Sequence, residues 1–424
     1  MAEKVRYYLE QSVPELEDLK KKGLFDKSEI TMIMRRRTDF EHRILGRGSK
    51  PKDFLKYSAF EMNLEKLRKK RYTRLSKAGA IDTKPSISDW AGVRRVLFIF
   101  DRATRKFPGN LELWAQYLLF AKSKGAVKVI YKVYSRLLQL QPRNVDAWLS
   151  AANYEFETNS NAKGARSLFQ RGLRFNSDSD NLWISYAQFE LVYVSKLLAR
   201  RRVLGLITDK QQQDDGKEEE SQKPTDNTTI DDNELNNDKI EVPETDDFNE
   251  KLKHLPEADM NMLGNPDTNP ALRGDIALTI FDVCISSIFS KPFEDKAQHD
   301  KKYFHLVNRF LTLFDRFDSL DRDHLYLHVL RHLQEVYPND SRTLVIDITL
   351  PIRSVTISSS NLSENLHLSV NKFMAYKAKS IGDSKDVLTK LFVDYVTEKF
   401  LNEAPNNEKI EMLLKNIIQK CRSL

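Results

Sequence analysis

Aromatic and apolar positions recur along the chain at a fixed interval. Trp114, Trp148 and Trp183 are separated by 34 and 35 residues, and each is followed by further apolar positions three and six residues later. Side chains at this spacing lie on one face of a helix, and Phe54 begins a fourth copy of the pattern. The residues that we expect in the core of these helices are Phe54, Tyr57, Phe60, Trp114, Tyr117, Phe120, Trp148, Tyr154, Trp183, Tyr186 and Phe189.

A second amphipathic pattern accompanies the first. Residues 126–140 and 162–175 carry apolar side chains at i, i+3, i+4 and i+7, which predicts a second helix in each repeat. Arg102, Arg136 and Arg171 keep the same register as the tryptophans. Helix pairs that repeat with a fixed period bury their apolar faces by stacking on their neighbours. The pattern therefore predicts an all-α helical-repeat fold, and it needs no cofactor.

Turn residues mark the junctions between the predicted helices. Pro108 and Pro142 each precede a tryptophan by six residues, and Ser177 stands at the third such position. Proline ends a helix because its nitrogen has no hydrogen to donate. We expect the next helices to be N-capped by Asn110, Asn144 and Asp180.

The rest of the chain divides by pattern into further regions. Residues 1–48 form an N-terminal helical region, predicted as two helices broken near Gly23, and residues 49–205 form the solenoid. Within the solenoid, helices over 52–75 and 88–107 are interpreted as one repeat with an enlarged connection. Residues 206–270 form a low-complexity insert, which we expect to be disordered because it is polar and poor in aromatics.

Residues 271–424 are predicted to form degenerate helical repeats. Helical periodicity resumes over 273–289, 303–317, 322–337 and 385–400. Residues 344–350 are β-branched and favour either a short strand or a helix that begins near Asp340 and Ser341.

Composition adds an asymmetry of charge to this picture. The net charge is +7, but residues 209–250 hold 16 acidic and 4 basic side chains, so this segment carries −12 and the remainder +19. A body so basic favours polyanions as neighbours. With 14 glycines and 14 prolines in 424 residues, the chain has few turn formers for a many-stranded β fold.

Two cysteines make no disulfide framework and no paired zinc-ligand spacing. The first residues lack the apolar run of a signal peptide, and no stretch approaches the roughly 18 apolar residues of a membrane span. We therefore expect a reducing compartment, no membrane and no metal.

Candidate chemistry is sparse. The sequence lacks the phosphate-binding, dinucleotide-binding, zinc-protease and serine-hydrolase motifs, which favours a protein that is not an enzyme and has no small-molecule substrate. His324, His328 and His332 lie on one helical face, as metal ligands do, but no cysteine or dense carboxylate cluster supports them. We interpret them as a partly exposed helix face. The acidic residues nearby are interpreted as capping and helix-end groups: Asp315, Asp318, Asp321 and Asp323.

Three basic runs are candidates for contacts with RNA phosphates or with partner proteins. Such contacts are salt-sensitive and indifferent to sequence. A solvated face or a nuclear-import signal is the alternative interpretation. The runs are Arg35, Arg36 and Arg37; Arg68, Lys69, Lys70 and Arg71; and Arg200, Arg201 and Arg202.

Two helices of the repeat resemble the HAT (half-a-TPR) repeat, whose family occurs in RNA-processing assemblies. Residues 183–190 resemble its first helix and residues 165–173 its second, whereas Ala121, Ala151 and Ser177 depart from its pattern. The resemblance implies a right-handed superhelical solenoid of HAT helix pairs.

The N-terminal region is similar to the start of the U3 small nucleolar RNA-associated protein 6 family. The residues that carry this resemblance lie at 5–10, 14–16, 22–25 and 37–41, with a weaker similarity at 274–277. The resemblance implies a nucleolar subunit of UtpB, a subcomplex of the small-subunit processome, which assembles on pre-rRNA and the U3 snoRNA. It also implies WD-repeat β-propeller proteins as partners.

Three functions remain open from the residues alone. The first is a non-catalytic scaffold that holds partner proteins on its helical-repeat surface. The second is a direct RNA-binding solenoid of another nuclear RNA-processing complex, and the third is an enzyme that uses the histidine face with a metal. The absence of catalytic motifs and the repeat pattern favour the scaffold.

Overall fold

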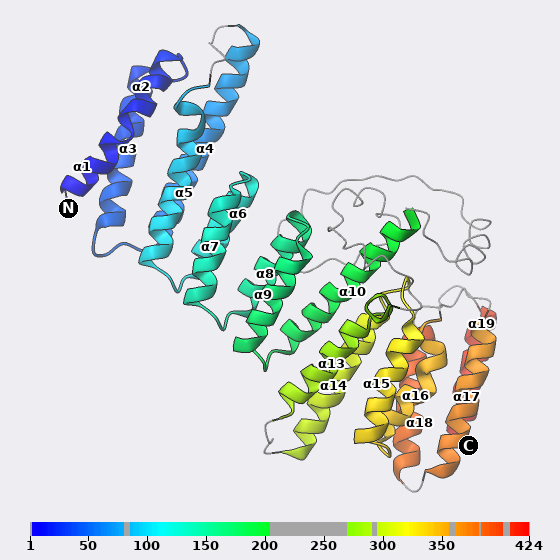
Figure 1. The fold of residues 1–424 in the computed structure, drawn as a ribbon. Coiled ribbons are helices and arrows are strands. Elements are labelled where there is room, and N and C mark those ends of the chain that lie inside the picture. The colour runs from blue at the N-terminus through cyan, green and yellow to red at the C-terminus, as the bar shows by residue number, and fades with distance from the viewer. Residues whose placement is uncertain are drawn as a thin grey trace. The chain divides into compact units, whose positions relative to one another are not determined.

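The computed structural model describes residues 2–79, 85–203, 269–290, 295–355, 361–380, 383–401 and 408–423 (Figure 1). Every regular element in these ranges is helical, which confirms the all-α prediction. The predicted acidic insert at 206–270 lies outside the described residues except for its last two. The chain forms two compact units, Met1–Ala147 and Trp148–Leu424, so the boundary falls inside the predicted solenoid.

The first unit consists of antiparallel helices in chain order (Figure 1). Neighbouring helices in the sequence are neighbours in space: α3 packs on α4, α4 on α5, α5 on α6 and α6 on α7. The helices are α1 (Ala2–Glu10), α2 (Val13–Lys21), α3 (Lys27–Leu45), α4 (Pro51–Lys77), α5 (Ser88–Lys106), α6 (Leu111–Ser123) and α7 (Val127–Leu140), and α8 (Val145–Asn153) continues into the second unit.

The first 48 residues form three helices, so the prediction of two was wrong. The break at Gly23 is present, with φ at +66°, a left-handed conformation that glycine adopts without strain. A further break separates α1 from α2, where Pro14 lies in the first turn of α2. Asp26 and Glu29 then form a capping box that starts α3.

The predicted helices of the repeat are present with small shifts of their ends. Asn110 caps α6 by accepting from Leu113 N–H at 3.1 Å, and Asn144 accepts from Ala147 N–H at 3.3 Å, as expected. Asp180, by contrast, is the first residue of α10 and not the residue before it.

The second unit also consists of helices. After α8, a π-helical turn leads to α9, and α10 packs against both α9 and α13 (Figure 1). The elements are η1 (Tyr154–Thr158), α9 (Ala162–Phe175), α10 (Asp180–Val203), η6 (Pro270–Arg273), α13 (Asp275–Ile288), α14 (Lys296–Phe314), α15 (Arg322–Val336), α16 (Ser341–Arg353), α17 (Leu362–Lys379), α18 (Asp383–Val396), η7 (Thr397–Leu401) and α19 (Glu408–Ser423).

Residues 344–350 are helical, which decides between the two alternatives left open by the sequence. They belong to α16, and Asp340 caps that helix by accepting from Arg342 N–H at 2.9 Å. Tyr337, the residue that follows α15, has φ −134° and ψ 62°. Three residues at the earlier junctions have nearly the same backbone angles: Phe107 at −127° and 68°, Gln141 at −131° and 65°, and Asn176 at −130° and 49°. The α15–α16 junction thus has the geometry of a repeat junction.

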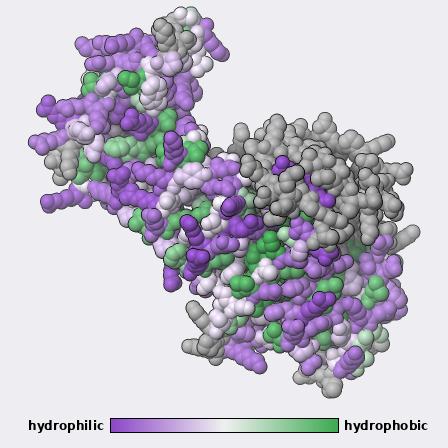
Figure 2. All heavy atoms as spheres, viewed as in Figure 1, coloured by the Kyte–Doolittle hydropathy of each residue, from purple (hydrophilic) through white to green (hydrophobic). Residues whose placement is uncertain are grey.

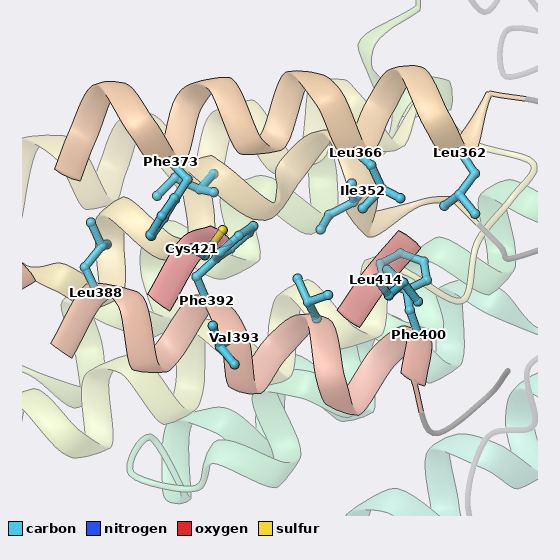
Figure 3. Packing of buried hydrophobic residues seen from close by; sticks show 12 residues of the cluster. Ile352, Leu362, Leu366, Phe373, Leu388, Phe392, Val393, Phe400, Leu414 and Cys421 are labelled. Atoms are coloured by element: carbon cyan, nitrogen blue, oxygen red, sulfur yellow. The ribbon is translucent and has the colours of Figure 1, made fainter. Parts of the chain in front are cut away.

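The last helices enclose an apolar cluster (Figure 3). Phe373 of α17 and Phe392 of α18 stack with ring centroids 4.8 Å apart, and Cys421 of α19 is buried beside them. Ile348 and Ile352 of α16 complete this part of the cluster. Burial also raises the pKa of the Cys421 thiol.

Candidate partner and nucleic-acid interface

One aromatic contact recurs three times and defines the repeat frame. A Tyr of one helix stacks on a Phe that lies 17 residues earlier, on the preceding helix. The pairs are Phe40 with Tyr57, Phe100 with Tyr117 and Phe169 with Tyr186, with centroid distances of 5.1, 5.6 and 5.3 Å and interplanar angles of 12°, 16° and 19°. Because Phe40 belongs to α3, the frame begins one helix earlier than the copy of the pattern that starts at Phe54 on α4.

The tryptophans join the start of one helix to the end of the previous one. The indole N–H of Trp114 donates to Pro108 O at 2.9 Å, and that of Trp183 donates to Ser177 O at 2.9 Å. Both rings are buried. The spacing of six residues between Trp and the Pro or Ser position is therefore the length of this hydrogen-bonded turn. Ser177 can stand in place of the proline because the bond uses only its backbone carbonyl.

An ion pair between an arginine and a buried glutamate occupies the same place in two repeats. Arg37 donates to Glu61 through Nε at 2.7 Å and a terminal nitrogen at 2.9 Å, and Arg166 donates to Glu190 at 2.6 and 2.7 Å. Both pairs span 24 residues. Hydrogen bonds to Glu190 raise the pKa of Arg166. Two repeats lie between these pairs, and their equivalent positions hold Leu97 with Ala121 in the first and Tyr131 with Glu155 in the second.

The first of these pairs belongs to a larger network in the first unit. Arg37 also reaches Glu15 of α2 at 3.4 Å, and Arg95 of α5 bonds Glu15 as well. Burial raises the pKa of Glu15, but the two arginines outweigh burial and the pKa is lowered overall. A neighbouring pair joins Arg68 to Glu65 at 2.8 Å, beside Gly92.

This network removes two arginines from the proposed contact surface. Arg37 is 0% exposed and Arg68 is 6% exposed, and each guanidinium forms an ion pair with a glutamate carboxylate. Arg71 is half-buried and bonds Glu29 at 2.7 and 2.8 Å. In this fold these three arginines form structural ion pairs with glutamates, so they are not available to contact phosphates.

The other members of the basic runs differ in exposure. Arg35, Arg36, Lys69 and Lys70 are exposed, and none forms an ion pair with another described residue. The third run ends α10, where Arg201 is 8% exposed, Arg200 is half-buried and Arg202 is exposed. Sequence proximity thus did not place the charges of any run on one surface.

The phasing arginines also differ in their contacts. Arg102 donates to Glu41 at 3.0 and 2.8 Å and lies 4.4 Å from the Tyr8 ring centroid. Arg136 approaches Asp101 at 3.8 Å, which places α7 beside α5. Arg171 is exposed. Their common register reflects the repeat and not one shared partner.

The histidine face of α15 packs on α13. His324 contacts Asp275 at 2.7 Å and His328 contacts Asp282 at 3.0 Å, while His332 packs against the Phe281 ring. No group of three potential metal ligands occurs among the described residues. Asp321 caps α15, as expected of a helix-end group, and Asp315 accepts hydrogen bonds from Arg353 and Tyr326.

The first unit also exposes apolar side chains that the repeat pattern does not indicate. Trp90 is 52% exposed, although the three tryptophans of the repeat are buried. Val127 and Leu140, at the two ends of α7, are also exposed. Trp90 lies outside the register of the other tryptophans, and this is the signal that separates it from the core. Elsewhere the visible surface is mainly hydrophilic, with small apolar patches between (Figure 2).

Two family models match the chain over adjoining segments. The model described as U3 small nucleolar RNA-associated protein 6 matches residues 9–95, and the model described as PRP39 N-terminal HAT repeat matches residues 86–206. The second match agrees with the helical-repeat fold. No described helix is both long and apolar enough to span a bilayer.

Curated relatives carry the first of these names. U3 small nucleolar RNA-associated protein 6 of Schizosaccharomyces pombe is 45% identical over 213 residues, 50% of this chain and 43% of the relative. The homologue of Homo sapiens is 34% identical over 197 residues, 46% of this chain and 32% of the relative. That of Dictyostelium discoideum is 25% identical over 440 residues, 97% of this chain and 68% of the relative. The matched part thus spans less than half of the first two relatives.

Proposed function

We propose that this chain, which is similar over part of its length to proteins named U3 small nucleolar RNA-associated protein 6, belongs to their family and is a non-catalytic scaffold in U3 snoRNA-dependent pre-rRNA processing. In this role it is a nucleolar subunit of the small-subunit processome, within UtpB. Its helical-repeat surface binds partner proteins, among them WD-repeat β-propellers, and so supports small ribosomal subunit biogenesis.

The recurring Phe–Tyr stack is the observation that carries this proposal. Phe100 with Tyr117 and Phe169 with Tyr186 lie between helices, so the repeat aromatics hold the helices together. The outer helix faces are then available to partners, and a regular frame keeps those faces rigid before binding, which lowers the entropic cost of association. Perturbed catalytic groups are not needed for this role.

Exposed apolar side chains on α5 and α7 suit a protein partner. Trp90 and Val127 are 52% and 43% exposed. Trp is enriched among the residues that dominate binding energy at protein interfaces, because a large ring buries much area with little conformational entropy to lose. We place partner contacts at these exposed side chains.

The test uses substitutions that leave the core unchanged. Tagged full-length chain with Trp90→Glu or Val127→Glu is recovered from cells, and the proteins and U3 snoRNA that accompany it are quantified. We expect the U3-containing particle with the unchanged chain and a loss of at least tenfold in one or more protein partners with the variants. Gln116→Glu on the exposed face of α6 is the control and retains them.

Two results would overturn the proposal. Recovery of the unchanged chain without U3 snoRNA removes it from the particle, and full recovery of every partner with both variants removes the partner contact from α5 and α7. Circular dichroism of each variant accompanies the measurement, because a loss of binding counts only when the helical signal is unchanged. Substitution of a buried residue such as Trp183 does not meet this condition.

A further inference from the structure

Helix α4 presents one face made almost entirely of cations. At 100° per residue, its exposed residues at 52, 56, 59, 63, 66, 70, 74 and 77 fall within an arc of roughly 80°. Two of these positions, Ala59 and Asn63, are neutral, and all eight are exposed. The other six define the lysine face: Lys52, Lys56, Lys66, Lys70, Arg74 and Lys77.

The acidic residues of α4 do not neutralise this face. Glu61 is buried against Arg37 and Glu65 against Arg68, on the opposite side of the helix. Asp53, the third acid, accepts the Lys50 backbone N–H at 2.8 Å. No residue of the lysine face forms an ion pair with any residue that the structure describes. The core thus uses the carboxylates of α4 and leaves its cations in solvent.

The layout of the face indicates which kind of group it contacts. Lys52 and Lys56 form one end and the remaining four cations the other, with the neutral pair Ala59 and Asn63 between. From residue 52 to residue 77 the face extends about 37 Å, at 1.5 Å per residue. Leu67, 41% exposed, is the one exposed large apolar side chain of α4 and lies at the edge of the face.

We propose that the lysine face of α4 binds the sugar–phosphate backbone of double-stranded RNA. Lysine ammoniums contact phosphates as point charges and read no bases. The two cationic ends contact phosphates on either side of a groove, and the neutral middle passes over the groove itself. Double-stranded RNA is recognised in this way, by shape and by its phosphates and 2′-hydroxyls.

Two other occupants fit the face less well. Single-stranded RNA is bound by aromatic rings on which bases stack, and the lysine face has none. Protein interfaces are depleted of Lys at their centre and enriched in aromatic residues, so the exposed ring of Trp90 suits a protein partner better than the lysine face does. The inference goes beyond the scaffold role, since a scaffold for proteins does not require contact with RNA.

The experiment measures binding of the full chain to a 20-base-pair RNA duplex of arbitrary sequence by fluorescence anisotropy across a salt series. The variant is Lys66→Gln, Lys70→Gln and Lys77→Gln together. We expect a loss of affinity on the order of 100-fold near 0.1 M salt, and a salt dependence shallower by about 2 to 3 in the log–log slope, because each phosphate contact contributes about 0.9.

A matched variant removes the same charge from another helix surface of the first unit. Lys128→Gln, Lys132→Gln and Arg143→Gln together neutralise three exposed cations on and after α7. We expect this variant to bind the duplex within about threefold of the unchanged chain, because the lysine face remains. Equal losses in both variants would overturn the proposal, since they would assign binding to net charge.

Competition experiments decide the occupant. Tighter binding of single-stranded RNA of the same sequence than of the duplex would overturn the duplex assignment. No RNA binding together with lysine-dependent binding of a polyglutamate peptide would assign the face to an acidic protein. Either result leaves the proposed scaffold function intact, because partner recovery is measured with Trp90→Glu and not with the lysine variants.

Discussion

The two units differ in the side chains that hold their helices together. In the first unit, ion pairs run through the interior: Arg37, Glu61, Glu15 and Arg95 link α2, α3, α4 and α5. In the second unit, the cluster of α16–α19 is built from apolar side chains, with Phe373 stacked on Phe392. Aromatic and aliphatic groups pack in many arrangements, whereas a buried charge is stable only opposite its partner. We infer that the stability of the first unit depends more strongly than that of the second on the exact alignment of neighbouring helices.

The ion pairs also explain why the surface of the first unit is so basic. Each carboxylate that α4 contributes to the interior is removed from the exterior, so the outward cations of that helix stay uncompensated. The second unit also pairs buried carboxylates with cations, at Glu190 with Arg166 and at Asp347 with Lys372. The following predictions test the contrast, from the largest expected effect to the smallest.

Replacing Arg37 with Ala should destabilise the first unit by about 3–5 kcal/mol, because Glu61 and Glu15 would lose a buried cation. Hydrogen exchange of the amides of α3–α5 would report the loss. The double variant Arg37→Met with Glu61→Leu should recover most of it, since it removes both charges and leaves Arg95 paired with Glu15. If the double variant is as unstable as the single one, charge pairing is not the cause.

Replacing Phe392 with Ala should cost about 3–5 kcal/mol in the second unit, through a cavity beside Phe373 and Cys421. Hydrogen exchange of α16–α18 amides is the measurement. A smaller apolar side chain would fill part of this cavity. The variant Phe392→Leu should therefore lose less than half as much stability as Phe392→Ala. A similar loss in both Phe392 variants would contradict a cavity mechanism.

Two glycine substitutions compare the tolerance of the two kinds of core. A Cβ at Gly92 would lie 2.5 Å from a Glu65 carboxylate oxygen that Arg68 holds in place, so Gly92→Ala should destabilise by about 1–3 kcal/mol. At Gly172 the Cβ would lie 3.1 Å from the Trp148 ring. There a small shift of the indole suffices, and the helix propensity of Ala, worth about 1 kcal/mol, should make Gly172→Ala nearly neutral. Thermal unfolding of both variants tests the ranking.

The smallest expected effect is that of a partly exposed ion pair at low pH. Hydrogen bonds from Arg71 are the main cause that lowers the pKa of Glu29 from 4.5 to about 2. The pair therefore stabilises the fold above pH 4.5, and its contribution is lost as the pH falls toward 2. Because the pair is 30% exposed, we expect Glu29→Gln to cost no more than about 1 kcal/mol at pH 7. The difference from the unchanged chain should vanish near pH 2.

Much of the repeat could be predicted because its signals are local. The period of the tryptophans, the apolar face of each helix and the caps Asn110 and Asn144 all follow from spacing along one or two helices. The Phe–Tyr spacing of 17 was equally present in the sequence and would have placed α3 in the frame. The tryptophan period does not indicate this helix, because α3 carries no tryptophan.

The basic runs were a poorer guide, for a physical reason. Adjacent residues in a helix point about 100° apart, so Arg35, Arg36 and Arg37 cannot share one face. Arg37 points inward to Glu61, while the other two remain in solvent. Cations four residues apart, such as Lys66 and Lys70, do share a face. Of these two, only Lys70 belongs to a basic run of the sequence.

The sequence by itself determined that this chain is helical, that its helices repeat with a period of 34 to 35 residues, and which aromatic side chains share one face of each helix. These properties depend on periodicity, which the chain carries in its own order. Only the tertiary structure decided which charges are buried and which are available, because the partner of Arg37 lies 24 residues away and that of Arg102 lies 61 away, on other helices. The cost of burying a charge without its partner fixed that division.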